Sequence, residues 1–281
     1  MNKIEEKYLP LIELLEGNSF LKTIENEYKG FITALNPLIS NPKILFIGIN
    51  PGPGAFDEKN QNSKGGEKNI NQKIYPKALF SDNKINQIDW LKEGNARGET
   101  IKKSWKAYKW YDRNKKVNNV FVKRLVEFFF TYYNINDKSD YDELENKINS
   151  DIFYSNLYPI STKTTKELNF ILKKIVSRQI RLNEKEVKNI KELKNFFRQR
   201  TIDIIKSINP EIIICLGNQA FKDLTSTNQK INPNDTLKRF EIKFRKNDEK
   251  EYPVYIVSRN GNWEGKIKTL GKHLQELKLT M

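Results

Sequence analysis

Two short apolar segments, each closed by turn-forming residues, constrain the fold of this chain more than any other feature. Residues 43–49 read Lys-Ile-Leu-Phe-Ile-Gly-Ile and run into Asn50-Pro51-Gly52. Residues 211–216 read Glu-Ile-Ile-Ile-Cys-Leu and are followed by Gly217. A continuous apolar run of this length, bounded by turn residues, is typical of a strand that is buried on both faces of a parallel sheet. The two runs therefore predict two strands of such a sheet.

The other segments alternate between helical and extended patterns. Apolar positions recur at helical spacing in residues 3–34 (one or two helices), 117–133, 184–208, 219–224 and from 264 onward, whereas 151–155 and 252–257 read as strands. Strands separated by helices favour a mostly parallel sheet covered on both faces. We therefore predict an α/β fold, a three-layer α/β/α sandwich around a central sheet of four mostly parallel strands.

The chain contains no Pro/Gly/Ser-rich linker and no internal repeat, so we expect residues 1–281 to form a single domain. Residues 1–40 would supply N-terminal helices. Two segments, 55–119 and 162–208, would be basic insertions. Residues 51–119 hold 15 basic and 8 acidic side chains, and residues 162–210 hold 13 and 5.

Net charge and residue counts exclude several classes of protein. The formal net charge of +15 would concentrate polyanions near the surface, although a solvated basic surface is the simpler alternative. One Cys and one His exclude an internal disulfide and a multi-Cys or His-rich metal site. No apolar run is long enough to span a membrane, and residues 1–6 have no signal-type apolar stretch. The expected location is the cytoplasm.

Polar residues follow each of the four predicted strands. They are Asn50-Pro51-Gly52-Pro53-Gly54, Asn156-Leu157-Tyr158-Pro159, Gly217-Asn218 and Ser258-Arg259-Asn260-Gly261-Asn262-Trp263. In open α/β sheets, ligands bind outside the carboxyl ends of the strands. We therefore expect these four loops to converge, and their convergence is the main functional signal in the sequence.

Common motifs do not fit these loops. The prolines of residues 48–54 remove N–H donors that a dinucleotide-binding turn needs, and the Gly-Lys-Ser/Thr ending of a P-loop is missing. His273 lies in the predicted last helix, where an ordinary surface histidine is the expected reading, so no Ser/His/Asp set is available. Cys215 lies in an apolar strand and is expected to be an inert core residue.

Four segments resemble the motifs of the uracil-DNA glycosylase superfamily, in that family's order. Gly48-Ile-Asn-Pro-Gly52 is similar to its first motif, and most to the mismatch-specific and single-strand-selective branches, which have Asn there. Asn156-Leu-Tyr-Pro159 is similar to the strand end whose Asn reads the flipped base. Residues 209–224 resemble its third strand and helix, and Tyr255-Ile-Val-Ser-Arg259 takes the place of its final motif.

The resemblance implies a DNA glycosylase that flips a base out of DNA and hydrolyses its N-glycosidic bond. Asn50 would hold the attacking water, with Asp57 as a further catalytic group. Asn156 would pair with the edge of the base, and Gly48, Pro51 and Gly52 would complete the pocket. Phe56 would stack on the base, with Tyr75 and Phe80 as alternatives. The reaction would need neither a metal nor an organic cofactor. A turn-forming Asn-Pro at 50 and a strand-end cap at 156 are the structural alternatives.

DNA contacts would come from two regions. The final motif would supply Ser258, Arg259, Asn260 and Trp263, through a phosphate contact, an inserted Arg or a wedging Trp. The helix at 184–208 would supply phosphate contacts, for which the candidates are Lys188, Lys191, Arg198 and Arg200. A salt-bridged Arg at a helix start and a merely solvated helix are the alternatives. DNA is the expected partner, with neither a membrane nor an obligate protein partner.

The final motif departs from the family pattern, because the His-Pro-Ser or Asn-Pro-Ser opening is replaced by Ser258-Arg259-Asn260. The His that many members use to stabilise the departing base is therefore missing. Three hypotheses follow: a monofunctional glycosylase for uracil or a related pyrimidine; a glycosylase for a bulky modified base of phage DNA, acting in antiviral defence; and a DNA-binding protein that has the fold without the reaction.

Overall fold

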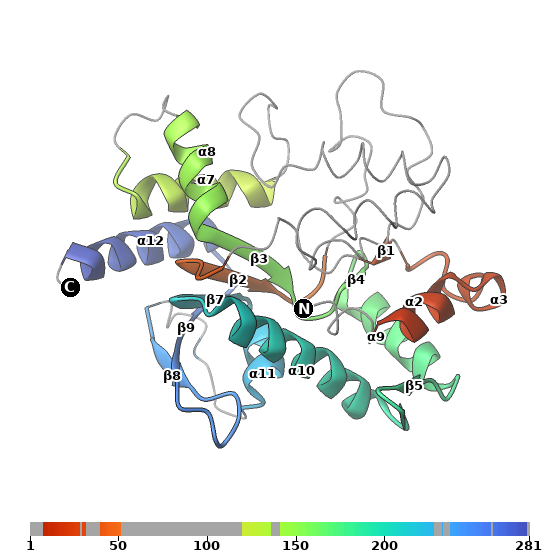
Figure 1. The fold of residues 1–281 in the computed structure, drawn as a ribbon. Coiled ribbons are helices and arrows are strands. Elements are labelled where there is room, and N and C mark those ends of the chain that lie inside the picture. The colour runs from red at the N-terminus through yellow and green to blue at the C-terminus, as the bar shows by residue number, and fades with distance from the viewer. Residues whose placement is uncertain are drawn as a thin grey trace. The chain divides into compact units, whose positions relative to one another are not determined.

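A computed structural model of the chain describes residues 8–28, 30–31, 40–51, 120–135, 141–227, 232, 237–259 and 261–279 (Figure 1). These residues fall into two compact units, which we describe separately. The first unit draws on Met1–Leu38, Asn50–Lys109 and Asn156–Ser207, and the second on Ile39–Ile49, Trp110–Ser155 and Ile208–Met281.

The second unit contains a five-stranded mixed sheet with the strand order β3-β2-β7-β9-β8. Its strands are β2 (Ile44–Gly48), β3 (Ile152–Asn156), β7 (Ile212–Leu216), β8 (Phe240–Ile242) and β9 (Tyr252–Val257). The last residue of β3, Asn156, falls in the first unit. β2 pairs in parallel with β7 (Ile44 opposite Ile212), and β7 pairs in parallel with β9 (Ile213 opposite Val254). All of β2 and most of β7 and β9 are buried, as the apolar runs predicted.

The prediction of four mostly parallel strands was wrong in two respects, because the sheet has five strands and is mixed rather than parallel. A fifth strand, β8, pairs antiparallel with β9 and lies at the edge of the sheet. β8 is only three residues long, and its middle residue, Glu241, is exposed. Because β8 lacks an apolar run and takes its hydrogen bonds from β9, nothing in its own sequence marks it as a strand. The α/β class and the parallel arrangement of β2, β7 and β9 are confirmed.

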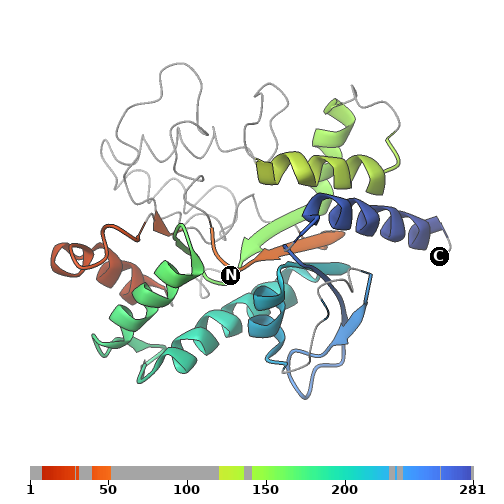
Figure 2. The same cartoon turned by 180° about the vertical axis from the view of Figure 1, so that it is seen from behind.

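The helices of this unit pack on the sheet and on one another. They are α7 (Val120–Tyr132), α8 (Tyr141–Asp151), α11 (Asn218–Thr225) and α12 (Trp263–Leu279). α11 contacts β7 and β9, whereas α12 contacts β9 and lies alongside α7 (Figures 1 and 2). Gly271 of α12 faces α7 so closely that a Cβ atom there would lie 2.9 Å from the carbonyl oxygen of Phe128. α7, α11 and α12 lie close to where the periodicity predicted helices, whereas α8 was not predicted.

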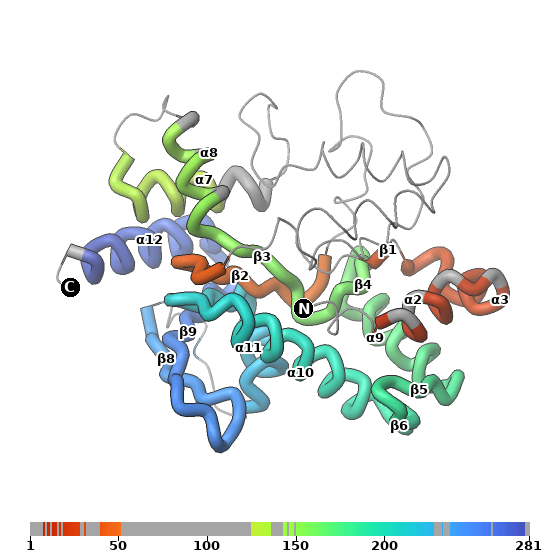
Figure 3. Tube along the Cα trace, in the orientation of Figure 1, coloured from red at the N-terminus to blue at the C-terminus, as the bar shows by residue number. Residues whose placement is uncertain are grey.

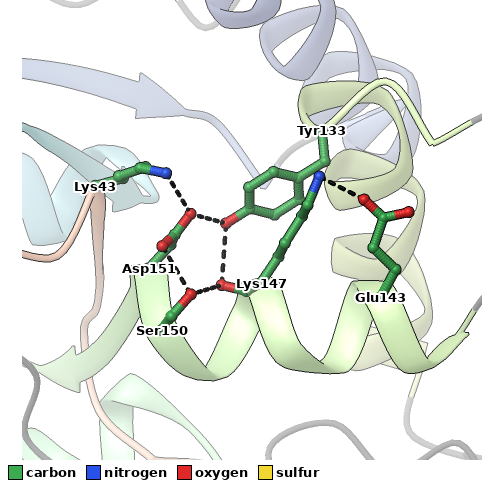
Figure 4. A network of polar contacts seen from close by, with 6 residues as sticks. All are labelled: Lys43, Tyr133, Glu143, Lys147, Ser150 and Asp151. Atoms are coloured by element: carbon green, nitrogen blue, oxygen red, sulfur yellow. Dashed lines mark hydrogen bonds and ion pairs between the residues drawn. The ribbon is translucent and has the colours of Figure 1, made fainter.

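A polar network joins the start of β2 to the ends of α7 and α8 (Figure 4). The Asp151 carboxylate accepts hydrogen bonds from Lys43 Nζ at 2.8 Å, from the Tyr133 hydroxyl at 3.1 Å and from Ser150 Oγ at 2.8 Å. Burial alone would raise the pKa of this carboxyl, but the hydrogen bonds from Lys43, Ser150 and Tyr133 and the charge of Lys43 outweigh it and lower the pKa.

The single cysteine and the single histidine are both structural in this unit. Cys215 lies in β7, is completely buried, and has its thiol pKa raised by that burial. The ring of His273 in α12 packs edge-on against Tyr255 of β9, with 6.2 Å between ring centroids. Both residues therefore lie where the sequence predicted them.

The first unit is mostly helical. It contains α2 (Leu9–Glu16), α3 (Asn18–Leu21), β1 (Gly30–Phe31), β4 (Ile160–Ser161), α9 (Thr165–Val176), β5 (Arg181–Leu182), β6 (Lys185–Glu186) and α10 (Ile190–Ile208). The last residue of α10, Ile208, falls in the second unit. β1 pairs antiparallel with β4, and the ring of Tyr8 packs against Phe31 and Phe197.

The predicted helix at 184–208 begins later than expected. Residues 181–186 form the hairpin β5–β6, because Asn183 and Glu184 adopt left-handed backbone angles (φ 50° and 64°) that suit a tight turn. Asn189 then caps α10, accepting a hydrogen bond from the backbone N–H of Glu192 at 3.0 Å. Figure 3 traces the chain from α9 through this hairpin into α10. In the parts of the chain described here, no helix has the length and apolar character needed to cross a membrane.

Candidate functional site

Asn50 ties the loop after β2 to the segment after β3. Its Nδ2 donates hydrogen bonds to Thr162 Oγ1 at 3.0 Å, to the carbonyl oxygen of Pro51 at 3.1 Å and to that of Ile160 at 3.4 Å. The backbone N–H of Thr162 also donates to the Pro51 carbonyl, at 3.2 Å. Two segments that are more than 100 residues apart in sequence are thereby joined within the first unit.

These contacts fix which end of the Asn50 amide faces the protein. Carbonyl oxygens only accept hydrogen bonds, so the NH₂ group must face Pro51 and Ile160. Asn50 Oδ1 then points elsewhere and accepts no hydrogen bond from the residues described. The side chain is half-buried. An amide oxygen held in this way can accept a hydrogen bond from a water molecule or a ligand.

Thr162 connects Asn50 to the start of α9. Its hydroxyl donates to the carbonyl oxygen of Thr164 at 2.9 Å while it accepts from Asn50. Thr164 caps α9 in a reciprocal capping box: its side chain accepts from Glu167 N, and Glu167 accepts from the backbone N–H of Thr164. The loop that holds Asn50 is therefore anchored to a regular helix start.

Asn156 is the last residue of β3 and is completely buried. Neither its Nδ2 nor its Oδ1 has a hydrogen-bond partner among the described residues. The residues that follow it, Leu157 and Tyr158, are also buried, and the Tyr158 ring packs edge-on against Phe197. A buried amide without partners costs about 1–3 kcal/mol of stability, so its retention calls for an explanation.

Arg200 of α10 contacts the backbone of Asn156. Its guanidinium donates from Nη1 to the backbone carbonyl of Asn156 at 3.4 Å and stacks on the ring of Tyr8, 5.4 Å from its centroid. The residue is only 4% exposed, so it offers little surface to a phosphate, and its role as a phosphate contact stays a prediction. The sequence of a basic helix does not reveal this burial, because Tyr8 covers the guanidinium from the far end of the chain.

The other basic residues proposed on this helix are accessible to different extents. Lys188 and Lys191 are exposed, which leaves them available to a polyanion. Arg198 is half-buried, and that burial lowers the pKa of its guanidinium. Their role as phosphate contacts stays a prediction.

The final motif belongs to the second unit, and only part of it is at the surface. Arg259 is exposed, and its side chain lies 3.9 Å from the position that a Cβ on Gly217 would take. Ser258 and Trp263 are 4% and 3% exposed. The Trp263 ring is buried at the first turn of α12, and its wedging or stacking on DNA stays a prediction.

The remaining predicted site residues divide into two groups. Gly48 ends β2 and is buried, and Pro51 is buried and accepts the two hydrogen bonds described above. Gly52, Phe56, Asp57 and Asn260 lie outside the described residues, as does the insertion 55–119. Within the described residues, no group of three or more His, Cys, Asp or Glu side chains could hold a metal ion.

Thr162, Thr164 and Arg200 contribute contacts that sequence reasoning missed or misread. Thr164 could have been found, because Thr-x-x-Glu before an apolar-periodic segment is the signature of a capping box. Thr162 carries no such signal, since its partner is a distant asparagine.

A scan against models of known protein families finds no match, and no curated protein is significantly similar to the sequence.

Proposed function

We propose that this protein is a DNA glycosylase that hydrolyses the N-glycosidic bond of a flipped pyrimidine base and leaves an abasic site. Within this proposal the fold is the three-layer α/β/α sandwich of the uracil-DNA glycosylase superfamily, and the protein acts in the cytoplasm without a metal or an organic cofactor. The observation that carries the proposal is the buried amide of Asn156, which has no hydrogen-bond partner among the described residues.

Asn156 offers what a pyrimidine edge needs. Its Nδ2 can donate to a base carbonyl oxygen while its Oδ1 accepts from the neighbouring ring N–H, so one amide satisfies two adjacent groups of a base such as uracil. The buried polar groups would then be satisfied only in the complex. A site of this kind rejects a base that lacks the matching edge, because the amide would again be left unpaired.

Asn50 suits the role of the residue that positions water. Its NH₂ group is held by Ile160 and Thr162, which leaves Oδ1 to accept a hydrogen bond from the attacking water. In the reaction the water oxygen bonds to C1′ as the C1′–N bond breaks, and the bonding pair leaves with the base. The attacking water gives up one proton to the solvent, and the base takes up one proton from the solvent. The sugar is cationic in the transition state, so alignment of a neutral water contributes more than strong basicity.

Arg200 would assist the departing base from behind Asn156. The guanidinium is buried and hydrogen-bonded to the Asn156 carbonyl, which fixes a positive charge close to the amide that would read the base. A fixed positive charge in a low-dielectric site favours the negative charge that develops on the leaving base. In this proposal Arg200 takes over part of the work of the His that is missing from the final motif.

A cleavage panel tests the proposal. Duplex and single-stranded oligonucleotides that carry one uracil, one thymine opposite guanine, hydroxymethylcytosine or glucosylated hydroxymethylcytosine are incubated with the protein and then treated with alkali, which cuts the strand at abasic sites. We expect cleavage at a pyrimidine, and a loss of about 100-fold or more in rate for Asn50→Ala and Asn156→Ala. Asn195→Ala, at an exposed position on α10, is the matched control. Binding without cleavage of any oligonucleotide would contradict the enzymatic proposal.

A further inference from the structure

The outward face of α9 is basic along its length. The opposite face is apolar and buried through Leu168, Ile171, Leu172 and Ile175. Exposed positions carry Lys166, Phe170 and Lys173, and Lys163 is exposed just before the helix. These side chains recur at the spacing that places them on one side of a helix.

No acidic side chain offsets this charge locally. Residues 162–178 hold five basic residues and a single acidic one, Glu167. Glu167 is engaged in the helix cap, where it accepts from the backbone N–H groups of Lys163 and Thr164 at 2.7 and 3.1 Å. In the described part of the chain, Lys163, Lys166 and Lys173 form no ion pair. Their charge is therefore available to an external anion.

Phe170 is unusual because it is an aromatic ring placed among these lysines and open to water. Only two large hydrophobic side chains among the described residues are exposed, Phe170 at 37% and Leu237 at 41%. The Nζ of Lys174 lies 5.4 Å from the centroid of the Phe170 ring. An exposed ring beside cationic side chains is the combination with which proteins hold unpaired nucleotides, the ring stacking on a base and the cations contacting phosphates.

The position of α9 connects this face to the candidate site. The helix begins at the capping residue Thr164, whose carbonyl oxygen accepts from Thr162, and Thr162 accepts from Asn50. All of these residues belong to one compact unit. The start of α9, where Lys163 and Lys166 lie, is therefore joined to Asn50 by two consecutive hydrogen bonds.

We propose that the outward face of α9 binds a single strand of DNA, whose phosphates contact Lys163, Lys166 and Lys173 and one of whose unpaired bases stacks on Phe170. The inference rests on the proposed function, since it takes DNA as the substrate. A single strand fits better than a duplex because the faces of paired bases are already stacked on their neighbours, whereas an unpaired base has a face free for Phe170.

The first test reverses charge on α9. Lys166→Glu/Lys173→Glu is compared with Lys222→Glu/Lys268→Glu, two exposed lysines on α11 and α12. Within α9 the two reversals lie near opposite ends of the helix, so their effects on its dipole largely cancel. Binding of labelled oligothymidine is measured by fluorescence anisotropy over a range of salt concentrations. We expect the α9 variant to bind about tenfold more weakly or worse, with a log–log salt slope smaller by about 1.4, since each lost phosphate contact on a single strand removes about 0.7.

The second test removes the ring. Phe170→Ala should weaken oligothymidine binding by roughly 5- to 100-fold, the range found for the loss of one base–aromatic stack, and should leave duplex binding nearly unchanged. Leu237→Ala, at the other exposed hydrophobic residue, is the matched control. Equal losses for single strand and duplex, or equal losses for the α9 variant and its α11/α12 control, would overturn the inference.

The two proposals can fail separately. Cleavage in the panel above, combined with oligothymidine binding that does not depend on α9, contradicts the α9 inference and leaves the glycosylase intact. Oligothymidine binding that depends on Lys166, Phe170 and Lys173, without cleavage of any substrate, contradicts the glycosylase and makes the protein a single-strand binder.

Discussion

Thr162 accepts a hydrogen bond from the side-chain amide of Asn50 at 3.0 Å and passes one on to the carbonyl oxygen of Thr164 at 2.9 Å. The hydroxyl thus acts as acceptor and donor at once, and it is almost completely buried. A side chain that lacks either function breaks the link between the loop after β2 and the start of α9. A substitution of Thr162 therefore tests directly whether the cleavage rate depends on the orientation of the Asn50 side chain.

We expect Thr162→Val to lower the cleavage rate by about tenfold and the free energy of unfolding by about 1–3 kcal/mol, because buried donors and acceptors are left unpaired while the volume is kept. Single-turnover cleavage and urea unfolding measure the two effects. Thr162→Ser retains the hydroxyl and should remain close to the wild type in rate. If Thr162→Val cleaves as fast as the wild type, the orientation of Asn50 does not depend on this relay.

Replacing Asn156 by Leu should separate function from stability. Leu has a similar shape and no polar atoms, so it removes the cost of a buried amide that has no partner among the described residues. We expect the free energy of unfolding to rise by about 1–3 kcal/mol while base excision is lost. Urea unfolding and the cleavage panel provide the readouts. A clear loss of stability would instead mean that the amide is satisfied in the free protein.

Acid should weaken the network around Asp151. Hydrogen bonds from Lys43, Ser150 and Tyr133 outweigh burial and hold the pKa of the folded-state carboxyl below its unfolded value of about 3.9. The charged Asp151 carboxylate therefore makes its full contribution to the free energy of unfolding above the unfolded pKa. This contribution is lost as the pH falls through the lower folded pKa. Asp151→Asn should lower the free energy of unfolding by about 1–2 kcal/mol near neutral pH. The effect is modest because Lys43 is partly exposed, so that solvent screens its ion pair with Asp151.

Unfolding of the wild type and of Asp151→Asn, followed from about pH 6 to about pH 2, measures this contribution as the difference between the two curves. The difference should shrink as the carboxyl protonates. A difference that stays constant across this range would show that the charge of Asp151 contributes nothing.

Gly271→Ala should destabilise the second unit even though alanine favours a helix. The new Cβ would lie 2.9 Å from the Phe128 carbonyl oxygen and 3.1 Å from the Phe128 ring, so α12 and α7 would have to move apart. Overpacking of this kind costs about 1–3 kcal/mol, more than the roughly 1 kcal/mol gained in helix propensity. Thermal unfolding measures the outcome.

The control is Gly265→Ala on the same helix. There the new Cβ would meet the side chain of Asn262, which can rotate away, although it then gives up a hydrogen bond to Gly265 N. We expect a smaller effect than at Gly271. Equal melting temperatures for the Gly271 variant and the wild type would mean that the two helices separate without cost.

The sequence predicted those elements whose signal is local. The strands inside the runs at 43–49 and 211–216 are almost entirely buried, as expected of parallel strands that are covered on both faces. That environment requires the continuous apolar pattern which identifies them. β8 was not predicted, because an edge strand of three residues is formed by its hydrogen bonds to β9 and has no apolar pattern of its own. The turn at Asn183 and the capping residue Asn189 lie before the actual start of α10. This start was not predicted, because basic residues on both sides of Asn189 are compatible with one continuous helix.

The candidate site was predictable where strand ends carry amides. Asn50 and Asn156 were identified from their positions after apolar segments, and both fall in the same unit. The burial of Arg200 was not predictable, because its guanidinium packs on Tyr8, which is far away in sequence. Charged and aromatic residues near a proposed site read as contacts for a ligand until the fold shows what covers them.

The burial of Cys215 gives this protein a built-in reporter of its own opening. Because the only thiol in the chain lies inside β7 and is held in its unreactive form by its surroundings, a water-soluble disulfide reagent can modify it only when the centre of the sheet becomes exposed. The rate of that reaction under native conditions therefore measures how often the sheet opens, with no added label and no engineered cysteine.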